Sequence, residues 1–398
     1  MGNYLTRLPI ILGLVFFSCT SLPKVADIDE ETQIPAISAI PAVPDLVIIP
    51  QKVDNFLTIV AVGDNLYHEI MIRSGEDGEY EPSYREIKAL VKASDIAFIN
   101  QETLLAGETY GFSGYPQFNT PQKVGIAIAA TGFNVVNHAS NHIMDKGKDA
   151  VFATMDFWDT IPDVKILGIH RSEEERNLPV LVEKNDITIG FLSYTYGTNA
   201  IPLPKDSPYL VSLINTEIMA KEIDALRPLC EFLIVSMHWG EEYSYEYNKQ
   251  QKNLAAFLAE HLVDLVIGHH PHVIQPIEYI ERPDGKLMLC YYSLGNLISA
   301  QTQTRTMLGA MAYIKLRKTL EPNGEAAIEF FDVGAIPLVT HFERNLSGLM
   351  VYPLYTYTEE LAEKHWRKTA QSEFSMDYLN DLTTKIFGDK EIRRNPFE

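Results

Sequence analysis

Cysteine is rare in this sequence, and its rarity excludes one class of fold. The 398 residues contain three cysteines, Cys19, Cys230 and Cys290, which are too few for a disulfide framework. Cys230 and Cys290 lie in apolar stretches typical of strands, where a cysteine usually behaves as a small buried hydrophobic residue. A disulfide between them is compatible with an exported protein, although the sequence does not establish one. With 46% hydrophobic residues, the chain is expected to fold around a large apolar core.

Positive charge is also scarce. The chain has 33 lysines and arginines against 53 aspartates and glutamates, which gives a formal net charge of −20. Nucleic acid binding requires clustered basic side chains that contact phosphates, so this balance argues against a nucleic-acid partner. The same charge disfavours an anionic polymer on the protein surface at large. A metal cluster can still dominate the field in its own pocket, because salt screens more distant charges.

The N-terminal apolar stretch is too short to cross a membrane as a helix. It runs from Leu8 to Phe17, and Ser18-Cys19 and a proline-rich segment follow it. This arrangement resembles a bacterial lipoprotein signal in which Cys19 is acylated, and a plain secretory signal with an incidental cysteine is the alternative. The resemblance implies an exported lipoprotein that is anchored in a membrane of the bacterial cell envelope. The implied segments are a signal peptide over 1–18 and a lipidated N-terminus with a disordered tether over 19–55.

Strand-like and helical patterns alternate over most of the remaining chain. Short apolar runs alternate with segments whose apolar residues recur at helical spacing. The expected helices are 82–94, 121–131, 147–160, 212–227 and 248–263. Toward the C-terminus, strands are expected at 309–316, 326–333 and 335–340, and helices at 358–369 and 376–386. This order predicts an α/β domain over 56–300, with 301–398 adding strands that complete it and terminal helices.

Five of the apolar runs end in polar residues that bind hard or borderline metal ions. In open α/β sheets, ligands collect outside the carboxyl ends of the strands, so residues distant in sequence meet there. Two carboxylates, an asparagine and histidines, in that order, suit a two-metal hydrolase site. The polar residues are, in chain order, Asp64, Glu102, Asn141-His142, His238 and His269-His270-Pro271-His272.

Each of these residues has an ordinary structural explanation when it is taken alone. Gly63-Asp64 is typical of a turn, Glu102 of a solvated strand end, and His238 of a half-buried histidine. An ordered set on five successive strand ends is harder to explain by structural needs. The set as a whole therefore favours metal binding.

The histidine-rich loops carry the most specific signal. His270 and His272 flank a proline, which lets two imidazoles address two neighbouring metals, while His269 is expected to project the other way. His142 follows Asn141 and is well placed to donate a proton to a leaving group.

The stretch from Thr58 to Ile298, about three fifths of the chain, resembles the CapA family of capsule and poly-γ-glutamate biosynthesis proteins, which are related to calcineurin-like metallophosphoesterases. The combined order of the matching motifs is specific even where single motifs are not. These motifs are Ala61 to Leu66, Asn100-Gln101-Glu102, Asn137 to Gly147, Met237 to Gly240, Gly268 to Val273 and Ser293 to Leu297.

The resemblance implies an αββα sandwich of the metallophosphoesterase type with two divalent metal ions, manganese, iron or zinc. One metal would be held by Asp64, Glu102 and His272, and the other by Glu102, Asn141, His238 and His270. His142 would act as general acid, and Asp145 would orient it.

The chain departs from the phosphoesterase pattern at two positions. That pattern has Asp-x-His on the first strand, and here the third position is Leu66, so His68 either substitutes for the histidine or lines the pocket. Glu102 stands where the phosphoesterases have a shorter carboxylate. Both changes bear on the activity more than on the fold. Further pocket residues expected are Asn65, His138, Glu241 and Asn296.

Two functions are compatible with these features. The first is an envelope-anchored capsule or poly-γ-glutamate biosynthesis protein that acts as a metal-dependent hydrolase or transferase on a cell-envelope polymer or its precursor. The second is a non-catalytic component that binds the polymer or serves in its export or assembly, and that keeps the metal-like pocket. A membrane-bound polymer synthase or export complex is the expected partner in either case.

Overall fold

The computed structural model describes residues 52–398 except 76–78, 345–346, 371–372 and 398. The expected signal peptide, Cys19 and most of the expected tether lie outside the described residues. β1 begins at Val53, so its first residues fall within the range 19–55 that was expected to be a tether. Among the described residues, no helix has the length and the apolar character needed to cross a membrane.

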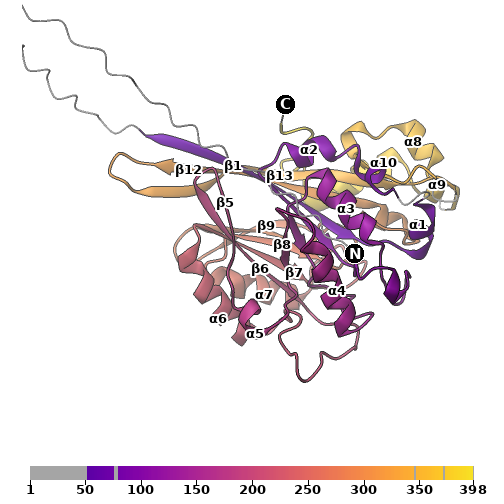
Figure 1. The fold of residues 1–398 in the computed structure, drawn as a ribbon. Helices are drawn as coiled ribbons and strands as arrows, with labels where there is room; N and C mark the ends of the chain where they lie inside the picture. Colours follow the sequence, from indigo (N-terminus) through magenta and orange to yellow (C-terminus); the bar gives the residue numbers. More distant parts are fainter. Residues whose placement is uncertain (1–51, 76–78, 345–346, 371–372, 398) are drawn as a thin grey trace, which may run out of the picture. The chain divides into compact units, whose positions relative to one another are not determined.

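Two β-sheets form the centre of the described part of the chain (Figure 1). The larger sheet has the strand order β14-β13-β12-β1-β2-β3-β4, with β11 paired to β1, and the smaller has the order β5-β6-β7-β8-β10-β9. The strands of the larger sheet are β1 (Val53–Asn65), β2 (Ile96–Gln101), β3 (Val135–Asn137), β4 (Lys165–Leu167), β11 (Asn296–Ile298), β12 (Leu308–Leu320), β13 (Ala326–His341) and β14 (Met350–Pro353). Those of the smaller sheet are β5 (Val180–Lys184), β6 (Ile187–Thr195), β7 (Phe232–His238), β8 (Leu265–His269), β9 (Ile277–Glu281) and β10 (Leu287–Tyr291).

The two sheets pack face to face. Phe232 of β7 meets Phe330 of β13 edge to face, with ring centroids 5.7 Å apart, and the Tyr291 hydroxyl of β10 donates to the Gly334 carbonyl of β13 at 2.7 Å. Near the carboxyl ends of the strands, the His269 ring stacks on Phe98 of β2 at 5.7 Å. The main hydrophobic core therefore includes the space between the sheets.

Strand β7 shows how the sequence sets this arrangement. Successive side chains of a strand point to opposite faces of its sheet. Phe232 and Ile234 belong to the core that contains residues of both sheets, whereas Leu233 and Val235 belong to a second core with the helices outside the smaller sheet. His238 has the parity of Phe232 and Ile234, so it faces the other sheet.

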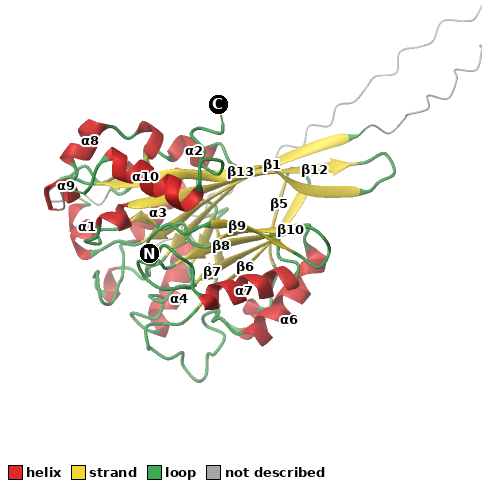
Figure 2. Cartoon of the chain, turned by 180° about the vertical axis from the view of Figure 1, so that it is seen from behind, coloured by secondary structure: helices red, strands yellow, loops and turns green. Residues whose placement is uncertain are grey.

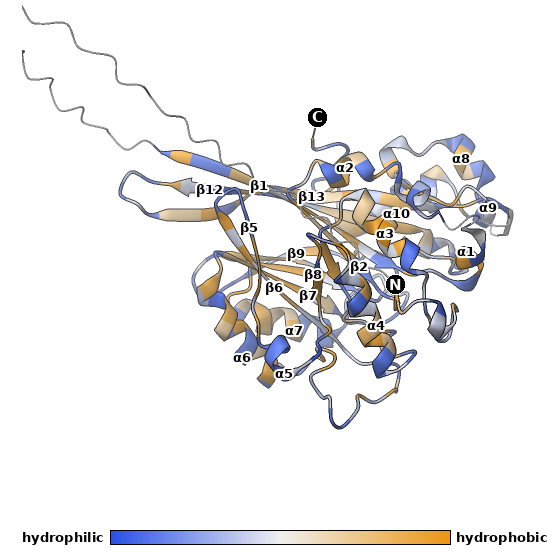
Figure 3. Ribbon diagram, in the orientation of Figure 1, coloured by the Kyte–Doolittle hydropathy of each residue, from blue (hydrophilic) through white to orange (hydrophobic). Residues whose placement is uncertain are grey.

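Helices cover the outer sides of the two sheets. In both ribbon views α6 and α7 lie beside the smaller sheet, and α2, α8 and α10 lie beside the larger one (Figures 1 and 2). The hydropathy colouring shows hydrophobic strands between helices that have both apolar and polar parts (Figure 3). These layers confirm the expected αββα sandwich. The α-helices are α1 (Glu69–Ser74), α2 (Lys88–Lys92), α3 (Gln122–Thr131), α4 (Lys148–Trp158), α5 (Glu173–Arg176), α6 (Thr216–Leu226), α7 (Lys249–Glu260), α8 (Glu359–Lys364), α9 (Trp366–Ala370) and α10 (Met376–Phe387).

Five expected elements differ from the structure. The segment 358–369 contains two helices, α8 and α9, separated at His365, instead of one. The segment 82–94 contains a 3₁₀ turn, Glu81–Tyr84, and then α2, instead of one helix. Helix α6 begins only at Thr216, because Asn215 caps it and the residues before it form β-bridges. The runs 326–333 and 335–340 are a single strand, β13, because its pairing with β12 continues across Gly334. Cys230 and Cys290 are both buried and unpaired.

Candidate metal centre

The polar residues at the five strand ends meet between the two sheets. The sequence had predicted that they lie along one edge of a single open sheet. Strands β1, β2 and β3 are parallel neighbours in the larger sheet, whereas β7 and β8 are parallel neighbours in the smaller one. Because the sheets pack face to face, the carboxyl ends of both sets come together. The larger sheet thus supplies Asp64 and Glu102, and the smaller sheet supplies His238 and the histidines after β8.

Gly63 allows β1 to approach the loop before β11. A Cβ atom at Gly63 would lie 1.9 Å from the Gly295 carbonyl oxygen, so the close approach needs glycine here. The Asp64 amide donates to that same carbonyl at 2.9 Å, which fixes the backbone of the next residue. The Asp64 side chain is fully buried as a result.

A ladder of hydrogen bonds orients the Asp64 carboxylate. The Asn100 amide nitrogen donates to Asp64 Oδ1 at 2.7 Å, and the Asn137 amide nitrogen donates to Asn100 Oδ1 at 2.6 Å. The Ser193 hydroxyl of the other sheet donates to Asn137 Oδ1. The strand register places Asp64 opposite Asn100 and Asn100 opposite Asn137, so the ladder follows from the pairing of parallel strands. The other Asp64 oxygen accepts from the His270 backbone amide at 3.2 Å.

Glu102 is a buried carboxylate without a hydrogen-bond partner. Both of its side-chain oxygens are inaccessible and unbonded among the described residues. Its Oε1 lies 3.9 Å from Nε2 of His238 and 3.9 Å from Nε2 of His272. Burial and the neighbouring charge of Asp64 raise the pKa of Glu102 well above its usual value. A cation at this position would remove the cause of that shift.

Two histidines of the loop after β8 point toward Glu102. His270 and His272 both have positive φ angles, 95° and 58°, which turn the backbone so that both side chains face inward. One ligand atom from each of Glu102, His270 and His272 lies within 4.8 Å of the others, so the three can hold a metal ion. Burial lowers the pKa of His270 to about 3, so its imidazole is neutral and able to bind a metal.

His272 is held by two acceptors. Its Nδ1 lies 3.0 Å from Asp64 Oδ2 and 3.0 Å from the side-chain oxygen of Asn296, which leaves Nε2 toward Glu102. Burial lowers the pKa of His272, but Glu102 and Asp64 outweigh it and raise the pKa to about 9. For Asp64, burial raises the pKa, but the hydrogen bond with His272, the charges of His272 and His269 and the hydrogen bond from Asn100 together outweigh it, and the net shift is downward. In the metal-free protein, a proton is therefore held among Asp64, Glu102 and His272. In the metal-bound protein, the metal cation would take its place.

His238 and Asn141 complete the group. The Asn141 side-chain oxygen lies 2.8 Å from Nε2 of His238, and the latter is fully buried. Burial, together with His270, lowers the pKa of His238 well below its usual value. The structure thus brings all six sequence-predicted ligands together, although the most compact trio, Glu102, His270 and His272, takes members from both ligand sets implied by the resemblance.

His142 lies beside this group and is oriented by Asp145. The His142 Nδ1–H donates to Asp145 Oδ2 at 2.7 Å, and the Phe118 backbone amide donates to the same oxygen at 2.7 Å. The Phe118 ring meets the imidazole edge to face at 4.6 Å, and Asn199 lies 3.2 Å from Nδ1. His142 Nε2 therefore remains available for a substrate.

The donor set fits divalent metal ions. Buried polar atoms normally have partners, and exceptions call for an explanation. Among the buried side-chain atoms of the described residues that have no hydrogen-bond partner, four belong to proposed ligands: both oxygens of Glu102, Nδ1 of His238 and Nδ1 of His270. Mixed oxygen and imidazole donors suit manganese, iron or zinc. A metal ion held by Glu102, His270 and His272 would neutralise the Glu102 carboxylate, whose oxygens have no hydrogen-bond partner among the described residues.

The other expected pocket residues lie in different places. Asn296 contacts His272, as described above. His68 is half-buried and packs on Phe118 with ring centroids 5.5 Å apart, so it lines the His142 side and does not reach the Glu102 trio. Asn65 hydrogen bonds with Gln101 and Tyr84 in the core, because it points to the opposite face from Asp64. Glu241 is exposed.

His138 is a core residue and not part of the pocket. It is fully buried, and its Nε2 accepts a hydrogen bond from the Trp158 indole at 2.7 Å. Burial lowers the pKa of His138 to about 3.

This shift predicts acid sensitivity. Because the unfolded chain binds a proton at His138 near the ordinary pKa and the folded chain does not, stability is complete above about pH 6.5 and falls as the pH drops toward 3. His138→Gln keeps an acceptor for Trp158 and should remove about 2 kcal/mol of the stability loss between pH 6.5 and 5. Urea unfolding at both pH values measures the difference. An unchanged loss in the variant would assign the acid sensitivity to other groups.

Three residues of the site rim do not follow from the sequence analysis. Tyr196 lies over both His238 and His270, with ring centroids 6.3 and 4.6 Å away, and is 45% exposed. Tyr243 lies 6.2 Å from the His272 ring, and the charge of Glu242 contributes to the raised pKa of Glu102. Tyr196 directly follows strand β6. It would have been predicted if the end of β6 had been among the strand ends considered.

Comparisons with known proteins find similar solved structures and similar curated proteins. The sulfate thiohydrolase SoxB from Thermus thermophilus has a TM-score of 0.37 and 12% identity, covering 77% of this chain and 45% of that one, values that carry no argument about the site. The PGA biosynthesis protein CapA of Bacillus subtilis (strain 168) is 27% identical over 273 residues, which are 67% of this chain and 69% of that protein. The capsule biosynthesis protein CapA of Bacillus anthracis is 27% identical over 291 residues, which are 69% of this chain and 66% of that protein.

The family resemblance drawn from the motifs is confirmed by a family model. The model described as bacterial capsule synthesis protein PGA_cap matches residues 58–301, which is more than half of the chain. Asp64, Glu102, Asn141, His238, His270 and His272 all lie inside the matched range. The protein therefore belongs to the bacterial capsule synthesis protein family PGA_cap.

Proposed function

We propose that this protein is a metal-dependent hydrolase or transferase of the bacterial cell envelope that acts on a capsule-type polymer or its precursor. The observation that carries the proposal is the buried carboxylate of Glu102, which has no hydrogen-bond partner among the described residues and lies among histidines of the opposite sheet. A polymer-binding surface does not need such an arrangement. Capsule or poly-γ-glutamate synthesis is supported as the context by the family and by the names of its CapA relatives.

The proposed site holds two divalent metal ions, manganese, iron or zinc. Asp64, Glu102 and His272 would hold one ion, and Glu102, Asn141, His238 and His270 the other. When bound, the ions would supply the Lewis acidity that stabilises negative charge at the reacting centre of an amide or phosphoester. Asn100 would keep one Asp64 oxygen occupied, so that the other stays directed at the metal side.

His142 would move the proton in this reaction. Its Nδ1–H donates to Asp145, so the imidazole keeps the tautomer and the orientation in which Nε2 addresses the substrate. Asp145 is itself fixed by the Phe118 amide. As the imidazolium, with Nδ1–H bonded to Asp145 and a second proton on Nε2, His142 would give the Nε2 proton to the leaving group as the bond breaks. Tyr196, partly exposed beside His238 and His270, would contact the bound substrate.

Turnover on a defined panel tests the proposal. The full chain, loaded with manganese, iron or zinc, is assayed on phosphodiester and γ-glutamyl amide substrates. We expect metal-dependent turnover on one class. Metal binding without turnover on either class would contradict the enzymatic proposal and favour a non-catalytic polymer-binding, export or assembly component.

We also propose that Cys19 becomes the lipid-modified N-terminus and anchors the protein in the envelope membrane, beside a membrane-bound polymer synthase or export complex. The apolar stretch that ends at Ser18-Cys19 and the proline-rich segment after it support this anchoring. Cys19→Ala should shift the protein out of the membrane fraction or leave it unprocessed, as measured by fractionation and intact mass. Ser18→Ala serves as the control, since a small residue remains before the cysteine. Unchanged fractionation of Cys19→Ala would argue for a plain secretory signal or another mode of attachment.

A further inference from the structure

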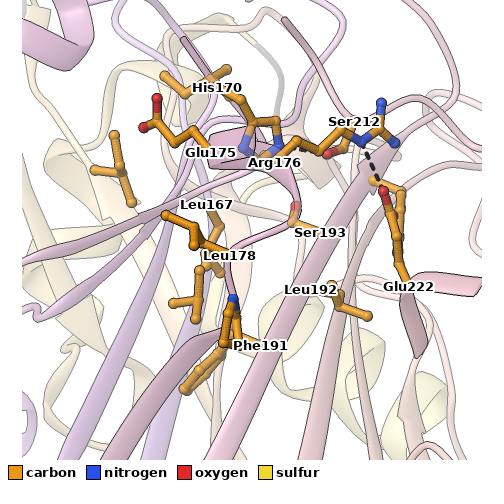
Figure 4. Close-up of a pocket in the computed structure, with 16 residues that line it drawn as sticks. Leu167, His170, Glu175, Arg176, Leu178, Phe191, Leu192, Ser193, Ser212 and Glu222 are labelled. Atoms are coloured by element: carbon orange, nitrogen blue, oxygen red, sulfur yellow. Dashed lines mark hydrogen bonds and ion pairs between the residues drawn. The ribbon is translucent and has the colours of Figure 1, made fainter. Parts of the chain in front are cut away.

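The segment 196–211, called the β6 loop below, begins directly after β6 and reaches the candidate metal centre. It returns to the end of β6 at Ser212, whose carbonyl accepts from the Thr195 amide at 2.9 Å. Ser193 of β6 and Ser212 line one cavity at the base of the loop (Figure 4). Tyr196, the first residue of the loop, lies beside two of the proposed metal ligands. The base of the β6 loop is therefore fixed on the sheet, and its first residues lie at the site.

A β-turn over residues 198–201 of this loop sets the direction of the Asn199 side chain. The Ile201 amide donates to the Thr198 carbonyl at 2.9 Å, and the Thr198 hydroxyl donates to the Ile201 carbonyl at 2.6 Å. The two central residues, Asn199 and Ala200, have φ angles of 48° and 60°, as in a type I′ turn. Asparagine is common at positive φ, whereas alanine is not, so this conformation is strained. Such strain persists where surrounding contacts hold it, and it is typical of functional sites.

Asn199 contacts the side chain of a proposed metal ligand. Its Oδ1 accepts from Nδ2 of Asn141 at 3.1 Å. The oxygen of the same Asn141 amide lies 2.8 Å from Nε2 of His238. The nitrogen of this amide thus faces the β6 loop, and its oxygen faces the other proposed ligands. Only the oxygen of an amide accepts, whereas its NH₂ group donates hydrogen bonds. The orientation of the amide therefore decides whether Asn141 can bind a metal.

The Tyr196 hydroxyl is the second acceptor for the Asn141 amide. Burial raises the pKa of Tyr196 to about 12, and a hydrogen bond from Asn141 partly opposes this rise. A rotation of the amide by half a turn would take its N–H groups away from both acceptors and point them at the other ligands. Asn199 is exposed, so its side chain is not part of the core and can be removed without leaving a cavity.

The nitrogen of the Asn199 amide does not make a comparable bond. It lies 3.2 Å from Nδ1 of His142, whose hydrogen is already donated to Asp145. Two donors face each other there, so no hydrogen bond joins them. The bond with Asn141 is therefore the contact through which Asn199 acts on the site.

We propose that Asn199 is a positioning residue of the metal centre, whose side-chain oxygen keeps the Asn141 amide in the orientation in which Asn141 Oδ1 can bind a metal. The inference rests on the proposed metal centre and not on any particular reaction. Outer partners of metal ligands contribute roughly 10- to 100-fold to metal affinity. The Tyr196 hydroxyl remains when Asn199 is removed, so the loss should be about tenfold, the lower of these values.

The affinity of the full chain for manganese and for zinc, measured by titration calorimetry, tests this role. Asn199→Gly removes the acceptor and keeps the turn, because glycine is favoured at positive φ. It should bind the metal about tenfold more weakly than the unmodified chain. Asn185→Gly is the matched control, since Asn185 has a φ of 51° in the turn between β5 and β6 and hydrogen bonds with Phe56 and Asp95 instead. Its metal affinity should be unchanged.

The same substitution in an Asn141→Asp background separates positioning from a structural role. A carboxylate has an oxygen at both ends, so its orientation no longer decides whether it can bind a metal. Asn199→Gly should then weaken metal binding by about twofold or less. A residue that only supported the fold of the loop would cause the same loss in both backgrounds.

Two results would overturn the inference and leave the metal centre in place. One is equal metal affinity of Asn199→Gly and the unmodified chain, and the other is an equal loss with Asn141 and with aspartate at that position. An unmodified chain that binds neither manganese nor zinc would overturn the metal centre and this inference with it.

Discussion

Replacing Glu102 with glutamine is expected to abolish metal binding while leaving the metal-free protein at least as stable as the unmodified chain. Both Glu102 oxygens are buried without partners, and burial together with Asp64 raises the pKa of this carboxyl group. Glutamine has nearly the same shape but no charge to desolvate, so the metal-free fold loses nothing by the change. The variant loses the ligand shared by both proposed metals. Loss of outer partners of metal ligands already costs roughly 10- to 100-fold in affinity, and a shared ligand should cost at least the upper value.

Melting curves with and without metal separate the two effects of Glu102→Gln. A divalent metal at a hundred times its Kd should stabilise the unmodified chain by about 2.7 kcal/mol, and the variant by almost nothing. Glu241→Gln is the matched control, because Glu241 is exposed on the loop after β7. Metal-induced stabilisation that survives in Glu102→Gln, or a large loss of stability without metal, would show that Glu102 has a structural role and not a ligand role.

Replacing His142 with alanine should remove turnover and keep the metal. General acid catalysis by a positioned side chain contributes roughly 10²- to 10⁴-fold, so kcat should fall by that factor. The proposed ligands are untouched, since His142 is held by Asp145 and packs on Phe118. Metal content by mass spectrometry and kcat on the substrate found active are the two measurements.

Two further variants define what a loss of activity in His142→Ala means. Asp145→Asn keeps the shape of the pair but weakens its hold on the His142 tautomer, so kcat should fall while KM changes little. His261→Ala is the control and should be active, because His261 ends α7, pairs with Asp224 and is not among the proposed ligands. Full turnover by His142→Ala would remove this residue from the proposed reaction, and loss of metal in the same variant would make it a ligand.

The spacing of apolar residues predicts which helices and strands form, but it does not predict where each of them begins and ends. Helix α7 was predicted because its apolar residues recur at helical spacing, which is a local feature, and the structure shows that Asn248 caps it. The break before α2 is not local, because the chain there is held by core contacts such as the hydrogen bond from the Tyr84 hydroxyl to Asn65. Strand β13 continues through Gly334 because it pairs with β12 on both sides of that residue. In the sequence, the glycine instead indicates the end of a strand.

The sequence predicted that the proposed ligands lie close together, but not how the two sheets supply them. Asp64, Glu102 and His238 were found because each ends a strand, and the structure brings these ends together. Single-strand periodicity cannot tell that two sheets supply them, since that depends on how the sheets pack. For the same reason, Asn100 was included in a motif but its role was not predicted. The strand register makes Asn100 the hydrogen-bond donor that orients Asp64.

His138 and His68 show that a histidine close in sequence to the predicted ligands is not necessarily a ligand. Both lie near the predicted ligands in sequence, but one is buried against Trp158 and the other packs on Phe118. Side-chain direction at a loop is set by backbone angles such as the positive φ of His270 and His272, which the sequence does not reveal.

The metal content of the purified full chain tests the central claim most directly. The protein is loaded separately with manganese, iron or zinc, freed of excess ion, and measured by mass spectrometry together with Glu102→Gln. The account predicts about two ions per unmodified chain with at least one of these metals, and almost none in the variant. An unmodified chain that retains no ion under any of these conditions, or a variant that retains the same number as the unmodified chain, would contradict the account.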